Sequence, residues 1–304
     1  MAPLNRASQE AIERLRSYVP PPTNYGEVPL SRRAAVLILL YADRRGGLKV
    51  VLTMRAKTLS SYAGQAALPG GRADTLDETP FQTARREARE EIGLSEQHLA
   101  PPFSVEHLCE LPASLAKTEL VVRPCVAMLH SHDQHNGQSA DPEVSLIPRL
   151  DAKEVAAVFT APFRNLLSMR DGAGGSPDDW YQGAWTEWHQ SNWRMHQFFV
   201  PIREGAVVKS RRKSDEQQQR AVAMLEEQER TGEAQRYRVF GMTARILVDA
   251  ARVAYGLEPE FEHNSHFGDE DMIARLRRMG RLSSERRASD QLTRDTMEKA
   301  AKLT

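Results

Sequence analysis

Cysteine is scarce in this sequence. The 304 residues include two, Cys109 and Cys125, and both lie inside apolar stretches. There is no Cys-x-x-Cys pair, and two cysteines cannot form a structural zinc site without other ligands. We therefore expect two reduced thiols in the protein core, which is typical of a chain that works in a reducing compartment.

Net charge and long apolar runs are lacking as well. The 41 basic side chains are balanced by 41 acidic ones, and the basic stretch 211–213 is too short to predict a nucleic-acid site. No run approaches the ~20 apolar residues that span a bilayer, and the N-terminus has no apolar signal segment. We expect an intracellular protein with neither a membrane nor a specific nucleic-acid partner, and the pattern leaves its oligomeric state open.

Strand-length apolar runs and helical patterns are both present along the chain. The expected strands are 34–41, 49–54, 105–111, 119–129, 155–159 and 195–200, and the expected helices are 80–92, 162–167 and 241–255. Gly46 and Gly47 predict a hairpin between the first two strands. Residues 209–235 are polar and predict either a solvated helix or disorder. This mixture is typical of an α/β protein with layered elements.

Three parts are expected along the chain. Residues 1–31 form an N-terminal helix and a proline-containing linker, residues 32–256 form the main domain, and residues 257–304 form a charged C-terminal extension. We expect this extension to be mobile or loosely docked, because it is charge-rich and only weakly periodic. Its Asp, Glu and His residues match no metal-site spacing, so we interpret them as solvated.

The helix expected at 80–92 has clear signals at both ends. Thr79 is a plausible N-cap, Pro80 fits the first helical position, and Gln82 completes a capping box. Gly93 is a natural stop. The residues at helical spacing that form its apolar stripe are Phe81, Ala84, Ala88 and Ile92.

Three glutamates project from one side of this helix. Glu87, Glu90 and Glu91 are spaced i, i+3 and i+4, within an arc of roughly 100°. Like charges so close together repel one another, so the set favours a bound cation, and hard oxygen ligands suit Mg²⁺ or Mn²⁺. Gly70 and Gly71, just before the helix, let backbone atoms approach a metal or a phosphate. The alternative is a charged surface helix with this spacing by accident.

The surrounding residues resemble the Nudix box, G-x5-E-x7-R-E-U-x-E-E-x-G-U, where U is aliphatic. Here Glu78 is followed by seven residues and then by Arg86-Glu87-Ala88-Arg89-Glu90-Glu91-Ile92-Gly93-Leu94. Six residues separate Gly71 from Glu78 instead of five, so either Asp77 or Glu78 can occupy the first acidic position. The resemblance implies an α/β/α sandwich with a mixed sheet and a metal-dependent diphosphatase.

The same resemblance assigns roles to residues of the box. Glu87 and Glu91 would be the principal metal ligands, with Glu90 assisting and Gly71 contributing its carbonyl oxygen. The first acidic residue, Glu78 or Asp77, would orient Arg86 through a salt bridge, and Arg86 would brace the loop. The catalytic base stays open between Glu90 and a carboxylate from a loop.

A second motif is similar to the signature of the coenzyme A diphosphatase branch, peroxisomal and fungal type. The pattern L-L-T-x-R-[SA]-x3-R-x3-G-x3-F-P-G-G is matched from Val51 to Gly71, with Val51, Ser60 and Leu68 as departures. The resemblance implies coenzyme A and its derivatives as substrate, with 3′,5′-ADP and a phosphopantetheine product, and a location in the peroxisome or the cytoplasm. The residues expected to bind the substrate are Arg55, Lys57, Gly64, Gly70 and Gly71.

Two other functions remain open. One is the same chemistry on another nucleoside or inositol diphosphate, such as an oxidised nucleotide. The other is a binding module with this fold and no activity. The segment 180–196 holds all four tryptophans and two histidines, His189 and His196. It could line a substrate pocket, although such clusters more often pack in the core.

Overall fold

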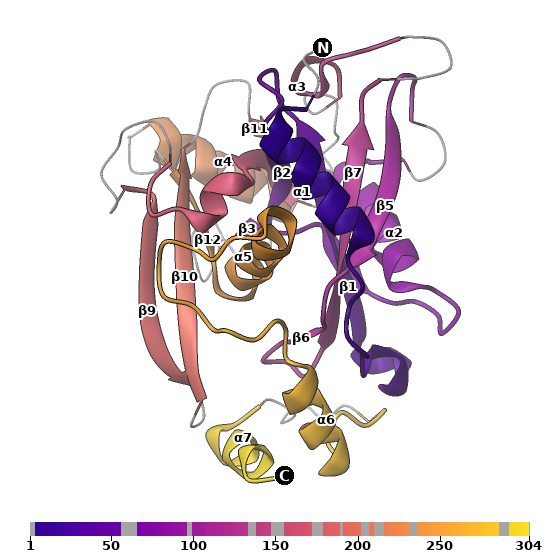
Figure 1. Ribbon diagram of the computed structural model, residues 1–304, viewed down its shortest axis with the longest axis vertical. Coiled ribbons are helices and arrows are strands. Elements are labelled where there is room, and N and C mark those ends of the chain that lie inside the picture. Colours follow the sequence, from indigo (N-terminus) through magenta and orange to yellow (C-terminus); the bar gives the residue numbers. More distant parts are fainter. Residues whose placement is uncertain are drawn as a thin grey trace.

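A large mixed sheet runs through the centre of the molecule (Figure 1). The computed structural model describes residues 4–55, 66–95, 99–132, 138–146, 155–171, 179–188, 191–201, 207–209, 216–230, 236–285 and 292–303. The long strands of the sheet are β1 (Arg33–Ala42), β2 (Leu48–Arg55), β5 (Ser104–Glu110), β7 (Val121–His130) and β8 (Val155–Pro162). The short ones are β3 (Ala66–Ala67), β4 (Gly70–Arg72), β6 (Ser114–Leu115) and β11 (Val207–Lys209).

The strand order is β11-β8-β2-β1-β7-β5, with β3 beside β2, β4 beside β1 and β6 beside β7. Strands β1 and β7 are parallel, and β1 pairs antiparallel with β2 through the hairpin at Gly46 and Gly47. The sheet is therefore mixed. A parallel pair at its centre must be covered on both faces, which agrees with the nearly continuous burial of β1 and β7.

Helices cover the two faces of this sheet. Along β1 the side chains alternate, so that Leu37 and Leu39 pack toward α2 (Pro80–Ile92) and Ile38 and Leu40 pack toward the opposite face. That opposite face is covered by α1 (Arg6–Ser17) and α5 (Gly241–Tyr255), which pack against each other. The expected α/β/α arrangement with a mixed sheet is confirmed.

A second, smaller sheet lies beside α5. It has the order β12-β10-β9, formed by β9 (Tyr181–Trp188), β10 (Ser191–Pro201) and β12 (Arg236–Phe240), all antiparallel. The remaining helices are α3 (Pro142–Ser145), α4 (Glu216–Arg230), α6 (Glu270–Arg278) and α7 (Arg294–Ala301), with 3₁₀ turns at Tyr25–Glu27, Leu30–Arg32 and Arg164–Leu167. Of the two expectations for residues 209–235, a solvated helix or disorder, α4 agrees with the solvated helix. It buries Leu225, while most of its described side chains are exposed.

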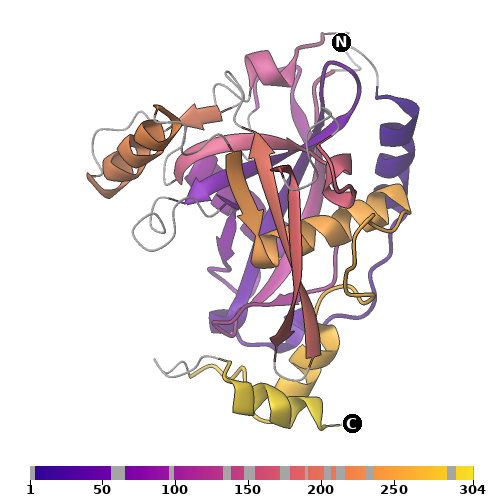
Figure 2. The same cartoon turned by 90° about the vertical axis from the view of Figure 1, so that its left-hand side faces the viewer.

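The expectation of a loosely docked C-terminal extension is wrong. Helices α6 and α7 lie together at the foot of the molecule (Figure 2). Their buried apolar side chains form a core of their own against the N-terminal linker and the starts of β6 and β7; it includes Tyr25, Val28, Val121, Ile273, Leu276, Leu292 and Met297. Two or three buried apolar residues on each short helix attach it to the rest of the protein. So few apolar positions produce little helical periodicity in the sequence.

Ion pairs also attach the extension. Glu119 and Arg32 are each 1% exposed and form an ion pair at 3.1 Å, and Arg281 forms a second ion pair with Glu119. Arg32 further donates hydrogen bonds to the carbonyl oxygens of Ser283 and Glu285. Arg281 of this segment is thus paired with the main body, and the backbone at Ser283 and Glu285 is bonded to it. The domain limits at 31/32 and 256/257 stay a proposal.

Candidate active site

Helix α2 is fixed at both ends as the sequence predicted. The Thr79 hydroxyl accepts a hydrogen bond from the Gln82 N–H, and the Gln82 side chain accepts one from the Thr79 N–H. Gly93 ends the helix in the left-handed conformation, with φ of 71°.

The apolar stripe of α2 packs against the sheet, where Ala84, Ala88 and Ile92 are fully buried. Phe81 is only partly buried and stacks on His107. The glutamates therefore project from a rigid helix.

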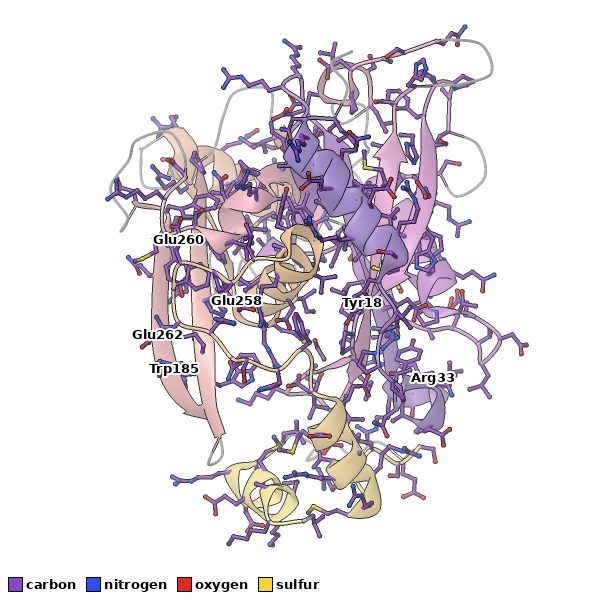
Figure 3. All side chains as sticks on the ribbon, viewed as in Figure 1. Tyr18, Arg33, Trp185, Glu258, Glu260 and Glu262 are labelled. Carbon is purple, nitrogen blue, oxygen red and sulfur yellow. The ribbon has the colours of Figure 1, made fainter. Side chains whose placement is uncertain are left out.

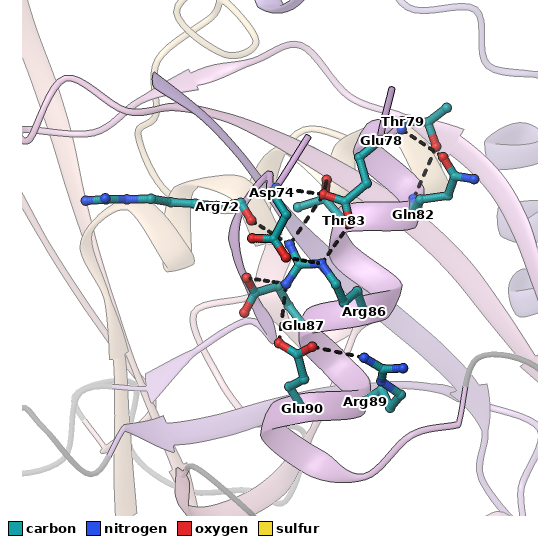
Figure 4. A network of polar contacts seen from close by, with 10 residues as sticks. All are labelled: Arg72, Asp74, Glu78, Thr79, Gln82, Thr83, Arg86, Glu87, Arg89 and Glu90. Carbon is teal, nitrogen blue, oxygen red and sulfur yellow. Dashed lines mark hydrogen bonds and ion pairs between the residues drawn. The ribbon is translucent and has the colours of Figure 1, made fainter. Parts of the chain in front are cut away.

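Arg86 is the centre of a polar network on this helix (Figure 4). Its Nε donates to Glu78 Oε1 at 2.7 Å, and its Nη2 donates to the carbonyl oxygen of Arg72 at 2.7 Å. Its Nη1 reaches Glu87 Oε1 at 3.1 Å and Glu90 Oε2 at 3.3 Å. One guanidinium thus connects the loop before the helix to two of the three glutamates, and its planar fork makes this geometry possible.

Glu78, and not Asp77, is the partner of Arg86. Burial opposes the ionisation of Glu78, but hydrogen bonds from Arg86, from the Asp74 N–H and from the Thr83 hydroxyl outweigh it and lower its pKa. Asp77 is exposed in the loop. The geometry therefore favours the register in which the extra residue precedes Glu78.

The same network includes a residue that the sequence did not single out. Asp74 Oδ2 lies 3.3 Å from Arg86 Nε, and Figure 4 shows its carboxylate between Glu78 and Glu87. Asp74 lies in a loop with no periodic pattern, so only the presence of an acidic residue between Gly71 and Glu78 could have suggested it.

Glu87 lies directly against the backbone of Gly71. A Cβ atom added to Gly71 would be 2.3 Å from Glu87 Oε1, so only glycine leaves room for this carboxylate. Burial raises the pKa of Glu87, and nearby Glu90 and Asp74 add to the increase, while Arg86 opposes it. The charged form of Glu87 is therefore under-compensated by the protein itself.

Glu91 and Gly70 form the third element of the site. The Gly70 N–H donates to Glu91 Oε2 at 3.1 Å. Gly70 has a φ of 155°, and a Cβ atom there would lie 2.3 Å from the carbonyl oxygen of Ala35. Strand β4 thus passes very close to β1 and holds Gly70 and Gly71 over two of the glutamates.

These groups fit a divalent cation with oxygen ligands. The described residues contain no group of three or more His, Cys, Asp or Glu side chains already gathered at metal distance. Glu87 and Glu91 nevertheless meet the same Gly70-Gly71 backbone, and the burial of Glu87 leaves negative charge that a cation would compensate. Mg²⁺ typically takes few protein ligands and completes its shell with water and substrate phosphates, as this arrangement allows.

The other expected binding residues are only partly described. Arg55 is the last residue of β2, while Lys57 and Gly64 lie outside the described residues, as does Ser60. Arg72 has an exposed side chain next to Gly71, and Figure 4 shows it pointing away from the network of Arg86. Among the side chains that the structure describes, Arg72 is the cation nearest in sequence to the glycine pair.

The tryptophans whose side chains are described, Trp180, Trp185 and Trp193, do not gather at this site. Trp180 is fully buried, and Trp185 is exposed and donates to Glu262 on the outer side of the small sheet (Figure 3). His196 is buried and hydrogen-bonded to the Tyr181 hydroxyl, and burial lowers its pKa to about 3, so it is neutral. Packing explains Trp180 and His196, whereas Trp193 faces a cavity described below. His189 lies outside the described residues.

Two acidic residues after α5, Asp269 and Glu270, are not solvated, which corrects part of a second expectation, whereas Glu262, His266 and Asp271 are exposed as expected. Asp269 Oδ1 accepts from Arg245 Nη1 at 2.7 Å, and Asp269 Oδ2 accepts from the Leu115 N–H at 2.8 Å. Glu270 accepts from the N–H groups of Asn24 and Ala113. These carboxylates attach the C-terminal segment to the linker and to the β6 region, which is a structural role.

Comparison with known proteins identifies the family. Residues 31–171 match the model of the NUDIX domain. The chain is 29% identical to "Peroxisomal coenzyme A diphosphatase 1, peroxisomal" of Saccharomyces cerevisiae over 289 residues, which cover 90% of this chain and 85% of the yeast protein. It is 32% identical to the Nudix hydrolase NudL of Yersinia pestis over 170 residues, covering 53% of this chain and 72% of that one. The chain belongs to the Nudix hydrolase family, whose members act on diphosphate bonds.

A plant relative is longer. "Nudix hydrolase 15, mitochondrial" of Arabidopsis thaliana is 31% identical over 230 residues, which cover 76% of this chain and 61% of that protein. The chain therefore spans less than two thirds of this relative, and the likeness to the yeast protein extends much further along both chains.

Proposed function

We propose that this protein hydrolyses the diphosphate bond of coenzyme A and its derivatives, giving 3′,5′-ADP and a phosphopantetheine product. The observation that carries the chemistry is the Arg86 network, which holds Glu87 beside Gly71 and also binds Glu90. The substrate is supported by the Val51–Gly71 motif and by the 90% of this chain that aligns with the yeast diphosphatase.

Glu87, Glu91 and the Gly71 carbonyl oxygen would hold Mg²⁺ or Mn²⁺, with Glu90 assisting. Such an ion, when bound, neutralises phosphate charge and lowers the pKa of the attacking water. Arg86 and Glu78 are positioning residues in this proposal, because their contacts run to other side chains and to the Arg72 carbonyl. Gly70 and Gly71 leave space for the diphosphate above β4.

Arg72 is our candidate for a phosphate contact, together with Arg55 and Lys57. Its exposed side chain follows the glycine pair by one residue and leaves β4 on the face opposite Glu87, so it would meet a part of the substrate that extends beyond the metal-bound diphosphate. If Arg72 or Arg55 meets the 3′-phosphate, replacement by Ala raises KM for coenzyme A more than for its dephospho form. Equal effects on both substrates would place that arginine on the diphosphate instead.

A substrate panel with product analysis tests the proposal. The purified protein is assayed with Mg²⁺ or Mn²⁺ on coenzyme A, acyl-coenzyme A, ADP-ribose, dinucleotide polyphosphates, oxidised nucleoside triphosphates and a diphosphoinositol. We expect the highest kcat/KM on coenzyme A compounds and the release of 3′,5′-ADP. A much higher kcat/KM on another diphosphate would agree with diphosphate hydrolysis but refute coenzyme A as the substrate. No metal-dependent turnover of any compound would support the binding module.

Location is a separate proposal, based on the name of the yeast relative. We propose a peroxisomal protein, with the cytoplasm as the alternative, and imaging of the native protein beside a peroxisomal marker distinguishes the two. No helix among the described residues is long and apolar enough to cross a membrane.

A further inference from the structure

A cavity of about 820 Å³ lies between the small sheet, the β6 hairpin, the start of α5 and the C-terminal helices. Its apolar wall contains Trp193 and Met195 from β10, Met242 from α5, and Phe267, Met272 and Met297 from the C-terminal segment. Of the lining residues, Leu115, Ala116 and Lys117 belong to the part that matches the family model, and the others come from outside residues 31–171. The cavity is thus built mainly by the segments that this chain adds to the common domain.

The larger, apolar part of the wall favours an apolar chain, while Lys117, Asp271 and Arg275 give the wall a charged part. Methionine side chains are flexible and polarisable, so they adapt to chains of different length. The carboxylate of Asp269 at the wall is already engaged by Arg245 and by the Leu115 N–H. Arg245 also lies 4.8 Å from the ring centre of Trp193, which holds the indole in place. The volume is within the ~300–1,000 Å³ of small-molecule sites.

The strand registers place this cavity near the glycine pair. Leu115 pairs with Val121, Val121 pairs with Arg33, and the next residue, Ala34, pairs with Arg72. Leu115 and Arg72 are therefore at the same level of the sheet and three strand spacings apart, or about 14 Å. Directly paired residues share a face, so Leu115, Val121 and Arg33 lie on the face of Gly71 and Glu87, whereas Arg72 lies on the opposite face.

We propose that this cavity binds the fatty-acyl chain of an acylated coenzyme A. The inference rests on the proposed function, because it needs a substrate whose diphosphate is held at Gly70 and Gly71. The pantetheine arm then covers the distance along the sheet, and the acyl chain fills the space between β10, α5 and the C-terminal helices. The added segments thereby act as a specificity element for long acyl chains.

A cavity-filling variant with a matched control tests this proposal. Ala116→Phe places a ring into the cavity, while the Ala116 N–H to Leu120 carbonyl hydrogen bond of the hairpin does not depend on the side chain. Leu257→Phe is the control. Leu257 is exposed just beyond the far end of α5, about 22 Å from Gly241 along a 15-residue helix. KM and kcat are measured for free coenzyme A and for its acetyl, octanoyl and myristoyl thioesters, below their micellar concentrations.

We expect KM of the wild type to fall by at least about tenfold from acetyl to myristoyl, because buried methylenes each contribute to binding. Ala116→Phe raises KM for the myristoyl compound by at least about tenfold and leaves free coenzyme A unchanged, and Leu257→Phe behaves as the wild type. A wild-type KM independent of chain length, or an Ala116→Phe effect equal for all substrates, would overturn the proposal.

A direct binding measurement separates the cavity from the reaction. Trp193 lines the cavity, so energy transfer from tryptophan to the fluorescent fatty acid cis-parinaric acid reports its occupation. We expect saturable transfer in the wild type and in Leu257→Phe, and its loss in Ala116→Phe. Turnover of coenzyme A without this binding would refute the acyl-binding role of the cavity and leave the proposed function intact. Binding without turnover of any coenzyme A compound would refute the proposed function and keep the apolar site.

Discussion

Replacing Glu87 by Gln tests the metal assignment through two effects of opposite sign. Burial and the neighbouring carboxylates raise the pKa of Glu87, so in the folded protein without metal its charge is less stable than in the unfolded chain. Arg86 at 3.1 Å opposes this effect but does not reverse it. A neutral side chain of the same shape therefore leaves the metal-free protein as stable as the wild type, or more so.

With metal the order reverses. An ion that binds only the folded state adds about 2.7 kcal/mol at one hundred times its Kd. For a chain of 304 residues that corresponds to a rise in Tm of about 4 °C in the wild type. Glu87→Gln loses one charged ligand, so this rise should nearly vanish, and kcat/KM should fall by at least about 100-fold.

Thermal unfolding with EDTA and with a Mg²⁺ series measures both effects. Glu143→Gln is the matched control, because Glu143 also pairs with a cationic side chain, Lys49, at the far end of β1. That control should lower Tm without changing the rise produced by Mg²⁺. The reasoning would be refuted if Glu87→Gln lowered Tm in EDTA and retained the wild-type response to Mg²⁺.

Three further changes have defined outcomes. Gly71→Ala brings a Cβ to 2.3 Å from Glu87 Oε1, so kcat should fall by at least about tenfold. Circular dichroism checks that the variant is folded, and steady-state kinetics measures the loss. Glu119→Gln leaves Arg32 buried without its carboxylate, and urea unfolding should show a loss of about 3–5 kcal/mol. Burial raises the pKa of Asp249 from 3.8 to about 6, so its protonation contributes stability below pH 4 that is lost as pH rises through 6. The stability of wild type relative to Asp249→Asn should fall over that window, and a flat difference would contradict it.

Local signals in the sequence predicted the bounds and the caps of helix α2 closely. Thr79, Gln82 and Gly93 are side-chain or backbone caps that act within a few residues, so their effect does not depend on the rest of the fold. The strands β1 and β2 were predictable for a similar reason, since a glycine pair closes their hairpin. The choice between Asp77 and Glu78 needed the structure, because it depends on where the loop places each carboxylate relative to Arg86.

Long-range packing was not predictable from the same signals. Ile273 and Leu276 on α6 are both fully buried, yet two apolar positions among charged residues look like an exposed helix. The charges of Asp269 and Glu270 suggested solvent, whereas they satisfy backbone N–H groups more than 150 residues away. A carboxylate that will meet a distant amide has the same local sequence as one that will meet water.

The docked C-terminus has a consequence for strand β1. Arg32 immediately precedes β1, and Glu119 lies two residues before β7, so their buried ion pair fixes the starts of the two parallel strands. Arg281 joins that pair from the C-terminal segment. The start of β1 is also where β4 pairs and holds Gly70 and Gly71 against the glutamates. One set of charges thus joins the C-terminal segment, which supplies part of the cavity wall, to the strand that pairs with β4. We therefore expect it to limit changes in the distance between the proposed acyl site and the proposed diphosphate site.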